Sequence, residues 1–100
     1  MLDRNFFLGF IRVHILYHAS KEPIYGVELI EELKRHGYAL SPGTLYPILH
    51  RLEEESLLIT EYRIVGGKRR RYYSLTDKGR EMLTSARKQI GELMNEVMQG

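Results

Sequence analysis

The stretch VGGKRRRYYSLTDKG, residues 65–79, decides the fold, because it sets four consecutive cations between two glycines and two tyrosines. Residues 58–65 and 70–75 favour β-strands, and Gly66–Gly67 is a typical two-residue hairpin turn. We therefore expect a β-hairpin that carries its positive charge at the tip. Tyr73 and Leu75 share one face of the second strand and are expected to anchor the base of the hairpin in the core.

The charges of this hairpin indicate a polyanionic partner. Pairing about the glycines sets Arg63 opposite Arg70, and the next pair toward the turn joins Ile64 and Arg69. Like charges that face each other destabilise a hairpin, whereas a phosphate backbone along the ribbon would replace repulsion by attraction. We interpret the hairpin as the wing of a DNA-binding domain. A solvated charged loop is the alternative interpretation.

Three helices are expected ahead of the hairpin. Residues 6–17 are apolar at almost every position, which predicts a helix that is covered on more than one side. A second apolar stripe begins at Val27 and stops at His36–Gly37, where the glycine can form a C-terminal cap. Ser41–Pro42 is a helix start signal, in which the Ser41 hydroxyl is expected to cap the helix and proline takes the first helical position. The third helix then carries its core stripe on Leu45, Leu49 and Leu52.

Pro47 lies inside this third helix and complicates its start. Proline removes a backbone hydrogen bond and clashes with the preceding turn. The helix therefore begins either at Thr44, with Pro47 in its first turn, or at Pro42, with a bend. We favour the start at Pro42 with a slight bend.

Three helices followed by a two-stranded wing predict a winged helix-turn-helix, a mainly α (α+β) fold, over residues 1–76. The N-terminal part of the third helix is expected in the major groove, and the wing on phosphates or in the minor groove. Tyr25 is as compatible with the core as with a phosphate contact. The predicted DNA-binding residues are Tyr25, Ser41, Gly43, Thr44, Tyr46, His50, Arg51, Lys68, Arg69 and Arg70.

Residues 77–100 are expected to form a C-terminal dimerisation helix with Thr76 as its N-cap. Its apolar residues recur at alternating spacings of three and four, as in a coiled-coil seam. The helix would span about 33 Å, longer than so small a domain covers. A stripe packed on its own domain is the alternative. The predicted interface of a two-fold homodimer consists of Phe6, Phe7, Phe10, Leu83, Ala86, Ile90, Leu93, Met94 and Val97.

Three motifs together resemble the PadR-like transcriptional regulators of bacteria and archaea: YGVELIEEL at 25–33, LSPGTLYPILHRLEEESLL at 40–58 and GGKRRRYYSLTDKGREML at 66–83. The length is similar to the shorter subfamily with one C-terminal helix. The resemblance implies a homodimeric repressor on a pseudo-palindromic operator, often relieved by small phenolic or drug-like molecules. The chain departs from the family pattern at His14 and His18, and it lacks the tryptophan on which some relatives stack planar ligands.

Ligand and metal sites are weakly indicated. Phe7, Phe10 and Met94 are predicted to line an adaptable pocket for a small planar apolar or phenolic effector. His14 and His18 have the spacing of two imidazoles that share a metal, but Glu22 is the only further ligand evident nearby. A structural role near the interface is favoured, so neither metal nor cofactor is predicted.

The composition excludes several classes of protein. One hundred residues with a net charge of +2 are typical of one globular domain, and the lack of cysteine excludes disulfides and thiolate metal sites. No apolar run approaches the roughly 20 residues of a membrane span, and the N-terminus does not resemble a secretory signal, so a cytoplasmic protein is expected. Neither a phosphate-binding glycine loop nor a catalytic triad order indicates an enzyme. A protein-binding winged helix and an RNA-binding module are the alternatives.

Overall fold

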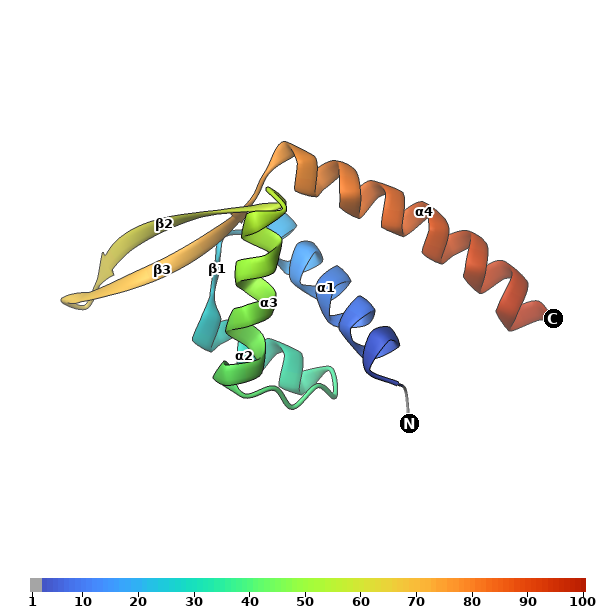
Figure 1. Ribbon diagram of the computed structural model, residues 1–100, viewed down its shortest axis with the longest axis horizontal. Coiled ribbons are helices and arrows are strands. Elements are labelled where there is room, and N and C mark those ends of the chain that lie inside the picture. The colour runs from blue at the N-terminus through green and yellow to red at the C-terminus, as the bar shows by residue number, and fades with distance from the viewer. Residues whose placement is uncertain (1–2) are drawn as a thin grey trace.

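The computed structural model describes residues 3–100, which form four helices and a three-stranded antiparallel sheet with the strand order β1-β3-β2 (Figure 1). The predicted winged helix-turn-helix is confirmed. The sequence did not predict β1, because a strand of two residues gives no readable alternation. The elements are α1 (Arg4–Lys21), β1 (Ile24–Tyr25), α2 (Gly26–Arg35), α3 (Pro42–Glu54), β2 (Leu58–Val65), β3 (Lys68–Leu75) and α4 (Asp77–Gln99).

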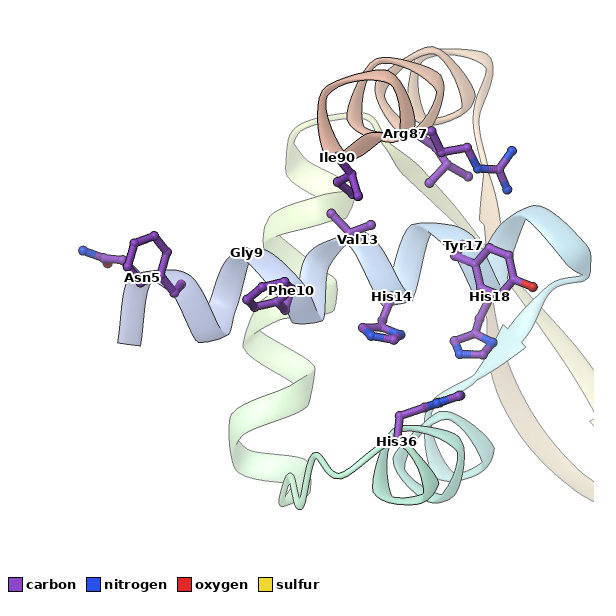
Figure 2. Close-up of a pocket in the computed structure, with 12 residues that line it drawn as sticks. Asn5, Gly9, Phe10, Val13, His14, Tyr17, His18, His36, Arg87 and Ile90 are labelled. Atoms are coloured by element: carbon purple, nitrogen blue, oxygen red, sulfur yellow. The ribbon is translucent and has the colours of Figure 1, made fainter. Parts of the chain in front are cut away.

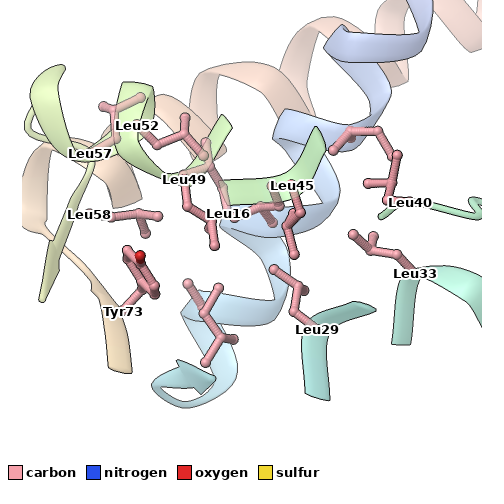
Figure 3. Packing of buried hydrophobic residues seen from close by; sticks show 14 of the residues in the cluster. Leu16, Leu29, Leu33, Leu40, Leu45, Leu49, Leu52, Leu57, Leu58 and Tyr73 are labelled. Carbon is pink, nitrogen blue, oxygen red and sulfur yellow. The ribbon is translucent and has the colours of Figure 1, made fainter. Parts of the chain in front are cut away.

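A single hydrophobic core lies between the three N-terminal helices and the base of the hairpin (Figure 3). The leucine stripe of α3 is fully buried there, as its spacing predicts. Tyr73 of β3 is 1% exposed, and Leu75 packs on the same core as a partly buried residue. The hairpin is therefore attached through its base, as expected. The fully buried aliphatic residues of the helices are Ile11, Ile15, Leu29, Leu33, Leu45, Leu49 and Leu52.

The third helix begins at Pro42 and continues through Pro47 to Glu54, so the earlier of the two predicted starts is confirmed. Ser41 occupies the N-cap position, but its side chain does not cap a backbone amide. Its hydroxyl lies 3.2 Å from Thr44 Oγ1 instead, as a hydroxyl–hydroxyl hydrogen bond. The prediction of a capping hydroxyl at Ser41 was therefore wrong. The preceding turn contains Gly37, whose φ of +90° is one that glycine adopts without strain.

The hairpin has the predicted register, with Arg63 opposite Arg70 and Ile64 opposite Arg69. Gly66 and Gly67 have φ values of +59° and +77°, the left-handed pair that a type I′ turn requires. β3 begins at Lys68, two residues earlier than predicted, so all four residues of the cationic run belong to the strand.

Glu53, near the end of α3, holds the hairpin against that helix. Its carboxylate accepts hydrogen bonds from the Arg71 guanidinium at 2.7 Å and from the Thr60 hydroxyl at 2.8 Å. Because these partners lie on β3 and β2, both strands are fixed to α3. The orientation of the wing relative to α3 is thus set by side-chain bonds as well as by the core.

The last helix is capped as predicted, with the Gly79 amide donating to Thr76 Oγ1 at 2.9 Å. Beyond its first turns α4 projects away from the domain, and the wing projects on another side (Figure 1). The radius of gyration is 14.6 Å, against about 13 Å for a compact chain of this length. Within residues 3–100, no helix combines the length and the apolar character that a membrane crossing requires.

Candidate nucleic-acid interface

The outward face of α3 lies opposite its buried leucine stripe. Gly43, Pro47, His50 and Glu54 recur at spacings of four, three and four, and all four are exposed. Sequence reasoning selected Gly43 and His50 but missed Pro47, because a proline inside a helix was treated only as a structural disturbance. Glu54 ends this face with a negative charge, whereas the first turn carries no acidic residue. The N-terminal half of α3 is therefore the part suited to a polyanion.

One flank of α3 faces the start of α1 across a hollow of about 420 Å³. Thr44 and Arg51 line it from α3, and Arg4 and Arg12 line it from α1. Arg12 forms an ion pair with Glu55, whereas Arg4 and Arg51 have no carboxylate partner among residues 3–100. Thr44 and Arg51, which the sequence predicted to contact DNA, thus lie on a cationic flank of α3 to which α1 also contributes arginines.

Tyr46 lies on the other flank and is not fully outward-facing. It is half-buried against the core, and a Cβ atom on Gly26 would clash with its phenol ring. Gly26 at the start of α2 therefore makes room for this ring. Tyr46 is thus less exposed than predicted, since the Gly26–Tyr46 contact could not be read from either helix alone, and its contact with DNA stays a prediction.

The wing carries its arginines on tyrosine rings. The Arg63 guanidinium lies over Tyr72 at 4.6 Å from the ring centroid, and that of Arg70 lies over Tyr25 at 4.7 Å. The opposed arginines thus rest on different rings, which explains how two like charges are accommodated in one cross-strand pair. Tyr25 belongs to this arrangement, because β1 pairs with β3 and brings Tyr25 opposite Tyr72.

Nearer the tip, the Arg69 guanidinium lies 3.7 Å from the centroid of Tyr62. The sequence prediction did not select Tyr62 or Tyr72, although in each strand the tyrosine directly adjoins an arginine. Because the rings already order the long arginine side chains, less rotamer freedom is lost when the wing binds a partner. The wing therefore presents cations that are already positioned.

The charges of the wing divide into paired and unpaired groups. Arg71 is paired with Glu53 at the base, and Arg63 is paired with Glu61. Lys68, Arg69 and Arg70 have no ion-pair partner within the described part of the chain. These are the three wing residues that the sequence predicted to contact DNA.

A second surface, the α1–α4 groove, is a hollow of about 610 Å³ whose wall combines apolar and histidine side chains (Figure 2). Phe10, Val13 and Tyr17 contribute from α1, and Leu83 and Ile90 from α4. Of the predicted pocket residues only Phe10 lines it. Phe7 instead packs edge-to-face on Tyr38 with ring centroids 5.7 Å apart, and Met94 lies outside the lining.

The predicted interface residues fall into two groups. Leu83 is 3% exposed and belongs to the domain's own core, so its assignment to a surface between chains was wrong. Phe7 is partly buried against that core, which leaves only part of its side chain for a second chain. Ala86 is half-buried. The remaining predicted residues are exposed, and their place in an interface stays a prediction: Phe6, Phe10, Ile90, Leu93, Met94 and Val97.

Comparison with known proteins gives one consistent family. Residues 15–85 match the model of the transcriptional regulator PadR-like family. The transcriptional regulator Rv3488 of Mycobacterium tuberculosis is 50% identical over 97 residues, which are 97% of this chain and 91% of that protein. A PadR family transcriptional regulator from Eggerthella lenta matches with a TM-score of 0.80 at 35% identity, covering 91% of this chain and 80% of that one. A PadR-like transcriptional regulator from Bacillus cereus matches with a TM-score of 0.76 at 35% identity, covering 92% and 94%.

Proposed function

This chain belongs to the PadR-like family of transcriptional regulators, and from that premise we propose that it is a cytoplasmic homodimer that binds double-stranded DNA in a sequence-specific manner. It is a regulator and not an enzyme. We further propose that it represses transcription and that a small planar apolar or phenolic effector relieves the repression.

Duplex DNA is the partner that fits α3 and the wing together. The outward face of α3 begins with a small residue, Gly43, and an acid-free first turn, so the helix can approach the major groove closely with its positive end. Lys68, Arg69 and Arg70 lie on a ribbon that Glu53 fixes to α3. These unpaired cations can reach phosphates or the minor groove beside the helix. This juxtaposition is the main support for the proposal.

A second copy of the chain is the proposed cover for the distal half of α4. Ile90, Leu93 and Val97 follow one another along one face and are 41%, 60% and 64% exposed. Exposed apolar surface of this kind marks an interaction site. In a two-fold dimer the same surface serves both chains, and two copies of α3 face one DNA duplex. The proposed interface consists of Phe6, Phe10, Ala86, Ile90, Leu93, Met94 and Val97, with residues 77–100 as the dimerisation helix.

The α1–α4 groove is the proposed effector site. Its volume of about 610 Å³ lies within the range of small-molecule pockets, roughly 300–1,000 Å³. Phe10, Tyr17 and Ile90 offer flat apolar contacts, and the histidines on its lower side offer hydrogen-bond partners for a phenolic hydroxyl (Figure 2). The groove is open in one chain, and a second chain on α4 would narrow it. A bound effector would thereby act on the spacing of the two α3 helices.

Selection of binding sites from a random duplex library tests the DNA-binding proposal, and it works for any operator sequence. We expect a two-fold symmetric sequence to be enriched and to bind at least about 10³-fold more tightly than its scrambled version at physiological salt. A winged helix that serves only as a protein-binding module predicts no enrichment and equal affinity for both duplexes. That result would refute sequence-specific DNA binding.

A further inference from the structure

Four side chains with metal-binding groups meet between α1 and α2. His14 and His18 are one turn apart on α1, and Glu32 is four residues before His36, the C-cap residue that directly follows α2. Figure 2 shows the imidazoles of the three histidines turned toward one another. The ring centroid of His36 lies 5.4 Å from that of His14 and 5.9 Å from that of His18. Two pairs with helical spacing therefore face each other across one gap.

Three of these residues already have nearly the geometry of a metal site. One ligand atom each from His18, Glu32 and His36 lie within 4.8 Å of one another, and Glu32 Oε2 is 3.9 Å from His36 Nε2. The ligand atoms of a tetrahedral Zn²⁺ site lie about 3.4 Å apart, as follows from metal–ligand distances near 2.1 Å. Small side-chain rotations close the difference, and His36 is exposed at a helix end where its rotamer is free to adjust.

The lone pairs of this cluster are available for an ion. His18 Nε2 is buried without a hydrogen-bond partner, which is an uncommon and costly state for a polar atom. The Arg35 guanidinium bonds to Glu32 Oε1 at 3.1 Å and leaves Oε2 facing the histidines.

We propose that His18, Glu32 and His36 bind a divalent transition-metal ion of the Zn²⁺ type, with His14 positioned as the fourth ligand. Imidazole nitrogens with one carboxylate suit Zn²⁺, Co²⁺ and Ni²⁺, whereas Ca²⁺ and Mg²⁺ prefer oxygen ligands. The sequence alone did not favour such a site, because Glu22 was the only further metal ligand evident near the two histidines of α1. The packing of α2 against α1 supplies Glu32 and His36.

An ion at this position would connect α1 to the end of α2 within the histidine-lined wall of the α1–α4 groove. The site goes beyond the proposed DNA binding, and its test requires no DNA. Because the ion binds the folded chain, it also stabilises that chain: at a free concentration 100-fold above Kd, the folding equilibrium shifts about 100-fold.

Calorimetric titration of untagged, EDTA-stripped protein with ZnCl₂ tests the site. We expect one ion per chain, and an affinity that falls more than about 100-fold in the double variant His18→Ala, His36→Ala, since even the loss of residues behind the ligands costs 10–100-fold. His50→Ala is the matched control, because His50 is the one histidine of this chain outside the cluster. It should bind Zn²⁺ as the wild type does.

Thermal melting with and without ZnCl₂ provides the second measurement. The wild type and His50→Ala should gain stability with Zn²⁺, whereas His36→Gln, which changes an exposed residue and should fold normally, should gain much less. Equal Zn²⁺ affinity in the wild type and His36→Gln would overturn the proposal, as would an equal loss in His50→Ala. Co²⁺ bound to the wild type should show the strong visible absorption of a tetrahedral ion. The weak spectrum of hydrated Co²⁺ would likewise overturn it.

Discussion

Replacing Arg69 and Arg70 with alanine removes two of the three unpaired wing cations from each chain while leaving the Glu53–Arg71 attachment of the wing intact. Each phosphate contact contributes about 0.9 to the slope of log affinity against log salt. Two lost contacts per chain therefore lower the slope by about 1.8, and by about 3.6 in a dimer. Over a roughly fourfold rise in salt, the affinity ratio of wild type to variant should then shrink by about 150-fold.

Fluorescence anisotropy with a labelled duplex, repeated at several salt concentrations, measures both slopes. The matched control is Arg80→Ala with Lys88→Ala, which removes two exposed cations from α4. The control should keep the wild-type slope, and scrambled duplexes should show the same change as specific ones, because phosphate contacts carry no sequence information. An unchanged slope in the Arg69, Arg70 variant would refute the reasoning, as would an equal change in the control.

Five further variants separate folding, recognition and assembly. Leu49→Ala should destabilise the fold by about 2–5 kcal/mol in chemical denaturation, because Leu49 is completely buried. Thr44→Ala should instead lower DNA affinity and leave the melting temperature unchanged. The reverse pattern would contradict the assignment of the faces of α3. Gly79→Ala should destabilise the fold by about 1–3 kcal/mol, because the added Cβ would clash with the Leu57 carbonyl oxygen. Gly91→Ala should stabilise the fold by about 0.5–1 kcal/mol, because a Cβ there meets no neighbouring atom and alanine favours the helix. Equal melting curves for the two variants would contradict this packing. Ile90→Asp with Leu93→Asp should give a monomer in light scattering that no longer holds a full operator more tightly than a half operator, and a variant that stays dimeric would refute the proposed interface.

Local signals were sufficient to predict most of the fold. The glycine pair at 66–67 determined the hairpin register, since a two-residue turn leaves one pairing available. The leucines of α3 predicted its buried face, and Thr76 predicted the start of α4. Each of these features depends on residues within about two turns of one another, where propensity and periodicity suffice.

Contacts between distant elements could not be predicted. Tyr46 packs against Gly26, and Leu83 joins a core that is otherwise built from earlier segments. The sequence pattern of its own helix does not show which other element each of these side chains contacts. The tyrosine supports of the wing arginines depend on β1, which is too short to give a pattern. The convergence of His36 with His18 likewise follows from the packing of α2 on α1.

A hydroxyl-radical footprint on the selected duplex tests the central claim most directly, because it reports α3, the wing and the dimer in one experiment. A dimer that places two copies of α3 in the major groove predicts two symmetric protected stretches, about 34–36 Å apart along the duplex. The wing predicts additional protection beside each stretch that disappears in the Arg69, Arg70 variant. A single protected stretch, or flanking protection that survives in that variant, would contradict the account.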